Sequence, residues 1–236
     1  YTYAGVYLAA NGVTVIAGGG AVSGQEYSFN GVSYLVVADK AALIVQRDAS
    51  RNLATVVTTR VTDLKSVFQS QTSFNQNISS WDTSSVTDMS FMFLGADVFN
   101  GDISSWVTSS VTNMSHMFAA TTAFNGDISS WVTSSVTNMS HMFAFTTAFN
   151  GDISSWNTSN VTSMGLMFTF AAAFNGNINS WDTSKVTNMS FMFYEATSFN
   201  KDLSGWNVLL VTSCDDFSTD ASSWLKPKPN LDNCTP

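Results

Sequence analysis

The residues that could perform chemistry recur every 25 positions, so each type occurs in several equivalent places. Asp102, Asp127 and Asp152 are one such series, and calcium prefers oxygen ligands of this kind. If successive repeats stack like neighbouring strands, these carboxylates lie about 4.8 Å apart and repel one another unless solvated, hydrogen-bonded or bridged by a cation. One carboxylate per repeat is a thin ligand set, and Asn77 and Asn177 replace it elsewhere. The series is therefore a weak calcium candidate, and no other metal is predicted.

Two histidines share a single repeat position, where the other repeats carry Phe91, Leu166 and Phe191. His116 and His141 could bind a metal together, but a catalytic zinc site needs a third protein ligand. We interpret the position as amphipathic surface. Serine and aspartate also recur in the repeats, whereas an active site is one unrepeated constellation of groups. The sequence therefore predicts no enzyme activity and no cofactor.

The chain contains two cysteines, Cys214 and Cys234. In a chain with secreted character, two lone cysteines are expected to pair. The closed loop of about 20 residues would stabilise the protein by roughly 3 kcal/mol. A catalytic cysteine is the alternative, but no histidine lies near either residue in the sequence. We predict a disulfide.

The large apolar residues follow the same period of 25. Six of the seven tryptophans form one series: Trp81, Trp106, Trp131, Trp156, Trp181 and Trp206. Valine, methionine, phenylalanine and isoleucine form parallel series. An asparagine series contains Asn75, Asn100, Asn125, Asn150, Asn175 and Asn200. We interpret the asparagines as partners for turn amides and carbonyls, with a ligand-binding row as the alternative.

One repeat cannot fold alone. Its seven or so large apolar side chains contribute on the order of 10–20 kcal/mol when buried. Ordering the residues of one repeat costs about 35–40 kcal/mol. Neighbouring repeats must supply the remaining burial and hydrogen bonds, which predicts a solenoid whose stability is a nearest-neighbour sum.

Within one repeat the spacing of Val111, Met114, Met117 and Phe118 predicts a short helical turn. The segment 128–131 is too short for a helix and predicts a brief strand or an extended corner. We therefore expect a solenoid of six to seven coils over residues 58–217, built from short strands and short helical turns. A C-terminal cap closed by the disulfide follows over residues 218–236.

Residues 1–57 lack the repeat and are expected to form a small β-rich cap over the first coil. Asn11-Gly12 and Asn30-Gly31 each lie between β-prone runs, which is a strong hairpin signal. Asp39 can cap a short helix through residues 40–47. The chain begins at Tyr1 rather than Met, which favours a mature or excised segment.

Residues 58–217 carry, with variations, the pattern W-D-T-S-x-V-T-x-M-S-x-M-F-x-x-A-x-x-F-N-x-D-I. This pattern resembles the repeat of BspA-like bacterial surface proteins, a relative of the leucine-rich repeats. The ending 230–236 also resembles the edge of such a module. The resemblance implies a leucine-rich-repeat-like solenoid, extracellular or cell-surface display and a role in adhesion or surface assembly, without catalytic residues. Val107 and Val132 depart from the pattern, which favours Asp or Asn there.

The less constrained positions are the candidates for a binding surface, because apolar and aromatic residues at exposed positions are typical of interfaces. The candidate set is Phe91, His116, His141, Leu166, Phe191, Phe145, Phe170 and Tyr194. Partial burial between coils is the alternative interpretation. A hydroxyl series suggests a further alternative, an ice-binding face: Thr83, Thr108, Thr133, Thr158 and Thr183.

The charge distribution narrows the choice of partners. The formal net charge is −8, and all nine Lys and Arg lie at or before Lys65 or at or after Lys185. Nucleic-acid binding requires cations that displace phosphate counterions, so no nucleic-acid partner is predicted. No apolar run is long enough to insert into a bilayer. The expected partner is a protein or glycan on a cell or matrix surface, and a structural subunit that assembles with copies of itself is the alternative.

Overall fold

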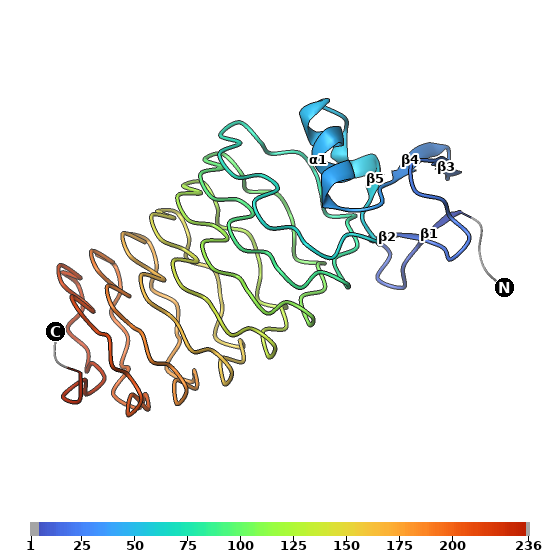
Figure 1. Ribbon diagram of the computed structural model, residues 1–236. Coiled ribbons are helices and arrows are strands. Elements are labelled where there is room, and N and C mark those ends of the chain that lie inside the picture. Colours follow the sequence, from blue (N-terminus) through green and yellow to red (C-terminus); the bar gives the residue numbers. More distant parts are fainter. Residues whose placement is uncertain (1–4, 235–236) are drawn as a thin grey trace.

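The computed structural model describes residues 5–234 as an elongated molecule, with a small N-terminal β-rich unit followed by a stack of coils (Figure 1). The two ends of the chain lie at opposite ends of the stack (Figure 1). The regular elements are β1 (Val6–Leu8), β2 (Val15–Ala17), β3 (Glu26–Phe29), β4 (Val32–Val36), α1 (Lys40–Asp48), the 3-10 turn η1 (Leu53–Thr55) and β5 (Val56–Val57). The outermost residues of the predicted caps, 1–4 and 235–236, lie outside the described residues.

Two antiparallel hairpins form where the sequence predicts them. β3 and β4 are joined by Asn30 and Gly31, whose φ angles of 50° and 77° are both positive, as a two-residue type I′ turn requires. β1 and β2 also pair as a hairpin around Asn11-Gly12. Residues 9–14 connect these strands, and the Asn11 side chain accepts the N–H groups of Val13 and Thr14.

The predicted helix is also present. Asp39 caps α1 by accepting the N–H of Ala42, and Leu43 faces the core with no exposed surface. The sequence gives no signal for the parallel pairing of β5 with β4, in which Leu35 lies opposite Val56. This pairing joins the N-terminal unit to the first coil.

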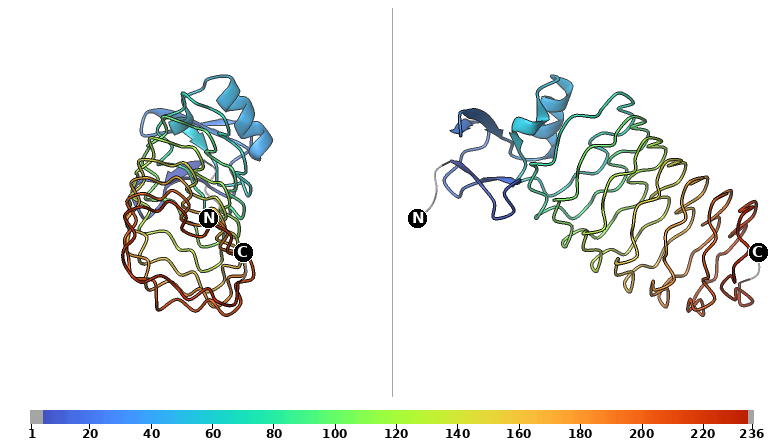
Figure 2. Two further views of the ribbon diagram at one scale, coloured as in Figure 1. Left: turned by 90° about the vertical axis from the view of Figure 1, so that its left-hand side faces the viewer. Right: turned by 180° about the vertical axis from the view of Figure 1, so that it is seen from behind.

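After residue 57 the chain winds through coils that partly overlap in the end view, each displaced from the one before it (Figure 2). Isolated parallel bridges connect seven equivalent positions, Asp63, Asp88, Asn113, Asn138, Ser163, Asn188 and Ser213. The segment 128–131, predicted as a brief strand or an extended corner, contains no strand: residues 129–130 form a turn, and residues 128 and 131 have no regular structure. Each coil therefore contacts the next through single bridges and turns rather than through extended strands.

The predicted helical turn from Val111 to Phe118 is wrong. The N–H groups of Met114, His116 and Phe118 bond to carbonyl oxygens of the following coil at 2.9–3.0 Å. The intervening N–H groups, such as that of Met117, bond three residues back to close β-turns. An α-helix would need all of these donors within its own turn, so bonding between coils excludes it.

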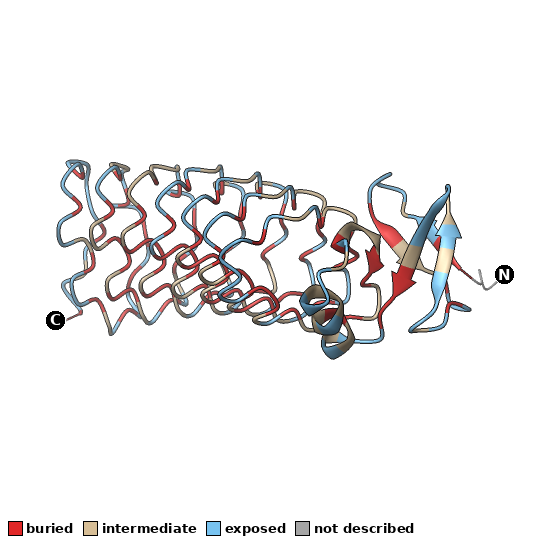
Figure 3. Cartoon of the chain, turned by 90° about the horizontal axis from the view of Figure 1, so that it is seen from above, coloured by how far each residue is buried: buried red, intermediate tan, exposed pale blue. Residues whose placement is uncertain are grey.

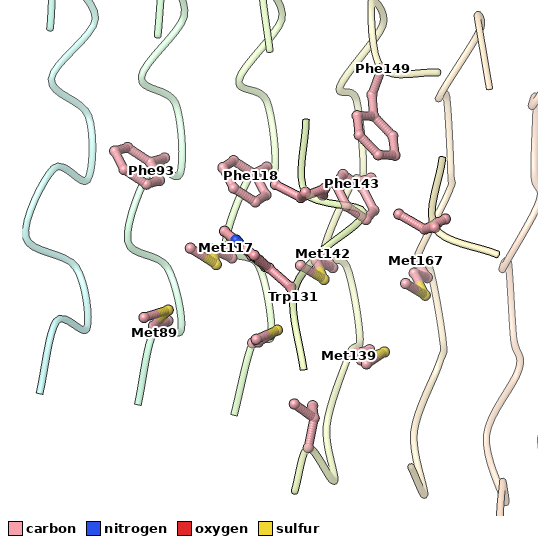
Figure 4. Packing of buried hydrophobic residues seen from close by; sticks show 14 of the residues in the cluster. Met89, Phe93, Met117, Phe118, Trp131, Met139, Met142, Phe143, Phe149 and Met167 are labelled. Atoms are coloured by element: carbon pink, nitrogen blue, oxygen red, sulfur yellow. The ribbon is translucent and has the colours of Figure 1, made fainter. Parts of the chain in front are cut away.

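The predicted apolar series form one core through the stack, coloured as buried along the coils in Figure 3 and shown as side chains in Figure 4. Trp131 and Trp156 stack with ring centroids 6.4 Å apart and an interplanar angle of 2°. The Trp131 indole N–H donates to the Ile103 carbonyl at 3.2 Å. All six predicted tryptophans of this series are buried and make this bond to an earlier carbonyl, so each coil is fixed to its neighbour by packing and by a hydrogen bond.

The C-terminal end is closed by a disulfide between Cys214 and Cys234, as predicted. Pairing between coils continues past residue 217. Trp224 lies 25 residues after Phe199, packs edge-on against it at 4.7 Å and donates its indole N–H to the Lys201 carbonyl. The Asn200 side-chain oxygen accepts the backbone N–H groups of residues 225 and 226, which lie one coil further along the stack. No helix among residues 5–234 is long and apolar enough to cross a membrane.

Candidate functional site

One face of the stack carries most of the candidate binding residues. We name it the ladder wall, and it consists of one nine-residue segment per coil: 62–70, 87–95, 112–120, 137–145, 162–170, 187–195 and 212–220. Alternate N–H groups along these segments bond to the adjacent coil, so the segments lie in register. The first, fifth and ninth residues of each segment form three rows with side chains that are exposed or partly exposed. A ligand lying on this wall would contact these rows.

The first row is a threonine series that the sequence interpretation did not single out. Its members are all exposed: Thr62, Thr87, Thr112, Thr137, Thr162, Thr187 and Thr212. From Thr87 onward each hydroxyl donates to the carbonyl of the preceding threonine at 3.2–3.4 Å. The V-T pair that recurs in each repeat is the signal that could have identified this row.

The second row, which we name the aromatic row, contains Phe91, His116, His141, Leu166 and Phe191, all half-buried. The rings of Phe91 and His116 stack at 4.4 Å, and those of His116 and His141 stack at 4.0 Å. The Lys65 ammonium lies 5.8 Å from the Phe91 ring centre, within cation–π range. The structure thus brings together side chains that are 25 residues apart in the sequence, in the order predicted.

The third row, which we name the outer row, includes Phe145 and Phe170, whose rings stack at 4.7 Å. Phe145 is 48% exposed. Tyr194 belongs one position earlier in its segment, but its ring packs edge-on against Phe170 at 5.5 Å and against Phe191 at 5.7 Å. The tyrosine therefore connects the outer row to the aromatic row and makes one continuous aromatic patch.

The aromatic side chains occupy an unfavourable backbone conformation. All five residues of the aromatic row have φ between 56° and 59°, and Phe145 and Phe170 have φ of 58° and 54°. This left-handed conformation costs an L-residue roughly 1–2 kcal/mol, and β-turns usually place Gly or Asn there. Gly95 shows that the outer row accepts glycine, because a Cβ added to it would meet nothing closer than 3.9 Å. The same strain occurs at the equivalent Ser66, Ala120 and Asp216, so it is a property of these rows, in which the aromatic side chains are the bulky members.

The paired histidines are neutral at pH 7. Burial of the imidazole, reinforced by the neighbouring His141, lowers the pKa of His116 to about 4, and burial also lowers the pKa of His141. The Nδ1 atoms of both rings are buried without a hydrogen-bond partner. Among residues 5–234 no three His, Cys, Asp or Glu side chains are grouped to hold a metal ion. In the row, the two rings are therefore uncharged aromatic groups stacked on each other.

The asparagine series has a structural role. The Asn100 side-chain oxygen accepts the backbone N–H of Asn125 at 2.9 Å, and the same bond recurs from Asn75 through to Asn200. The aspartate series also serves turns: Asp127 and Asp152 accept the N–H groups of Ser129 and Ser154. These bonds lower the pKa of both carboxyls. Asp102 makes the same contact with the serine two residues on, so the weak calcium candidates each serve a local turn.

The threonine series that suggested an ice-binding face is buried. Thr83, Thr108, Thr133, Thr158 and Thr183 are each 1% exposed. Their hydroxyls donate to carbonyls of the next coil at 2.8–3.0 Å. The prediction that this series could contact ice is therefore wrong.

The two valines that depart from the repeat pattern lie exposed. Val107 and Val132 are 43% and 49% exposed. In other coils Asp82 or Asn157 accepts the backbone N–H of the residue two positions later, and a valine side chain cannot accept it.

A separate hollow of about 530 Å³ lies at the C-terminal end, lined by residues that include Asp216 and Lys228.

The family described as "Mycoplasma protein of unknown function, DUF285" matches this chain twice, over residues 40–144 and 126–230. Together the two matches cover the coils and α1. No curated protein and no solved structure matches the chain.

Proposed function

The chain belongs to the family described as Mycoplasma protein of unknown function, DUF285, and we propose that it is a non-catalytic binding module of an extracellular or cell-surface protein. Within this proposal the stack is a leucine-rich-repeat-like solenoid of the BspA-like type. Its ligand is a protein or a glycan on a cell or matrix surface, and its role is adhesion or ligand capture.

The aromatic patch is the observation that carries the proposal. Phe145, Phe170, Tyr194 and Phe191 form one contiguous group of rings on the ladder wall. Apart from the half-buried Phe91, the other Phe and Trp side chains of the coils are buried in the core, so this patch is not left over from packing. Exposed aromatic clusters are the usual anchors of binding surfaces, because they bury large area at little entropic cost.

Two further features support an extracellular, non-catalytic role. The Cys214–Cys234 disulfide fits an oxidising compartment. The polar groups of the coils recur from coil to coil and are used in turns and ladders, as for Asp127 and Asn100. An active site would need a unique arrangement of such groups.

The proposal is tested by binding of the purified chain to arrays of glycans and of extracellular-matrix proteins. We expect saturable binding that is lost in the double variant Phe145→Ser/Phe170→Ser. The matched control is Val107→Ser/Val132→Ser, which removes two exposed apolar side chains outside the ladder wall. Binding that survives the phenylalanine changes, or that is lost equally in the valine control, would contradict the proposal.

Self-assembly into a filament or layer remains the alternative use of the same exposed rings. It is distinguished by light scattering and electron microscopy of the purified chain. A monodisperse monomer at high concentration supports the binding module. Ordered polymers that dissolve in the Phe145→Ser/Phe170→Ser variant would replace it.

A further inference from the structure

Ring stacking covers aromatic faces both in the aromatic row and in the patch. His116 has Phe91 stacked on one face at 4.4 Å and His141 on the other at 4.0 Å. Phe145 and Phe170 likewise cover each other at 4.7 Å, and the Tyr194 edge lies against Phe170. A sugar stacks on an open aromatic face, and ring stacking here covers both faces of His116 and one face each of Phe145 and Phe170. Grooves between ring edges instead suit apolar side chains of a protein segment.

Both rows become acidic at the C-terminal end of the wall. Asp216 follows Phe191 in the aromatic row, and Glu195 and Asp220 follow Phe170 in the outer row. Asp216 and Asp220 are exposed, and Glu195 is partly exposed. Within residues 5–234, none of these three carboxylates forms an ion pair. Lys228, which lines the hollow beside Asp216, donates to the Ser218 hydroxyl instead.

The negative charge reaches the aromatic patch. Burial, followed by the carboxylates of Glu195, Asp220 and Asp216, raises the pKa of Tyr194. No Lys or Arg occurs between residues 66 and 184, so no cation of the central coils offsets this rim. The patch therefore combines aromatic rings with a rim of carboxylates that form no ion pair within residues 5–234.

Four of the five N-terminal cations are already engaged within the chain and are poorly suited to fill this site from a second copy. Near the N-terminus, Lys40 pairs with Asp63, Arg47 with its neighbour Asp48, and Arg51 with Glu26. Arg60 is held by the Ser23 hydroxyl and the Ala21 carbonyl. A second copy would have to break these contacts before it could offer most of its N-terminal cations, so charge complementarity favours a different protein.

We propose that the aromatic patch and its acidic rim, Glu195, Asp216 and Asp220, bind a protein segment that carries Lys or Arg next to apolar side chains. The apolar side chains lie between the ring edges of Phe145, Phe170, Tyr194 and Phe191, and the cations reach the rim. This inference rests on the proposed function, because it specifies the partner of the same surface.

The test is a selection of random displayed peptides on the purified chain. We expect the enriched peptides to contain more Lys and Arg than the starting library, together with Leu, Met or aromatic residues. Their affinity should fall as salt rises, because exposed charge pairs are screened.

The selected peptides are then measured against two charge variants by calorimetry. Glu195→Gln/Asp216→Asn/Asp220→Asn should bind about tenfold more weakly, as expected for the loss of three exposed charge pairs. The matched control, Asp102→Asn/Asp127→Asn/Asp152→Asn, removes the same charge at positions where Asn77 and Asn177 occur naturally, and should bind as the wild type does.

Each remaining outcome counts against the inference. Enriched peptides without a basic excess, an equal loss in both charge variants, or no enrichment would overturn it. A glycan that binds the wild type and is lost in Phe145→Ser/Phe170→Ser would also overturn it while leaving the proposed function intact. If neither peptides, matrix proteins nor glycans bind, both proposals fail together.

Discussion

Replacing Ala120 by glycine should stabilise the protein, the opposite of the usual effect. Ala120 lies in the outer row with φ of 55°, and its N–H bonds to the Ala144 carbonyl at 2.7 Å. The left-handed conformation costs alanine roughly 1–2 kcal/mol. Glycine removes that cost, but it raises the conformational entropy of the unfolded chain, which destabilises the folded protein by about 0.4–1 kcal/mol. The net expectation is a gain of about 0.5–1 kcal/mol in the free energy of unfolding.

Gly95, the equivalent residue of the preceding coil, shows that the packing change is small, since a Cβ there would have only the Ser70 Cα as a neighbour, at 3.9 Å. The assay is urea unfolding followed by tryptophan fluorescence, with melting temperature as a second readout. A chain of this size should gain about 1–4 °C.

Ala148→Gly is the matched control, because Ala148 is exposed and its φ is not positive. That change should destabilise by about 0.4–1 kcal/mol. If Ala120→Gly destabilises as much as Ala148→Gly, the strain assigned to the rows of the ladder wall is refuted.

Three further outcomes are expected. Trp131→Ala should cost about 3–5 kcal/mol, because it opens a cavity in the tryptophan stack and removes the indole hydrogen bond to the Ile103 carbonyl; an unchanged melting temperature would contradict this. Cys214→Ser should cost about 3 kcal/mol in non-reducing unfolding, and two free thiols in peptide mass spectrometry of the wild type would refute the bond. Folding lowers the pKa of both histidines, so the unfolded chain binds protons more readily than the folded one, and the protein should lose stability as pH falls from about 6.5 towards 4. The variant His116→Leu/His141→Leu should lose less stability over this pH range, as measured by the urea midpoint.

The sequence predicted the core well because its period is longer than any local structure. Tryptophans 25 residues apart can be buried together only if the chain returns to the same place once per repeat. The same reasoning applied to Phe199 would have placed Trp224 in the last coil. It was missed because a different aromatic residue occupies the position.

The ladder wall could not be derived in the same way. Val111, Met114 and Met117 are three residues apart, a spacing shared by a helical turn and by successive β-turns. The hydrogen bonds that decide between them run to the following coil, as from Met114 to Asn138, and depend on stacking that no local pattern specifies. The positive φ angles of His116 and Phe145 could not be predicted for a different reason. Gly or Asn in a sequence indicates a positive φ, whereas His or Phe does not.

The measurement that tests the account most directly is carbene footprinting of the chain, by mass spectrometry, with and without a bound ligand from the array or the peptide selection. The account predicts that labelling falls at Phe145, Phe170, Tyr194 and Phe191 and stays unchanged at Val107 and Val132. Protection of the valines or of the N-terminal cap, with the aromatic patch still labelled, would show that the ladder wall is not the binding surface.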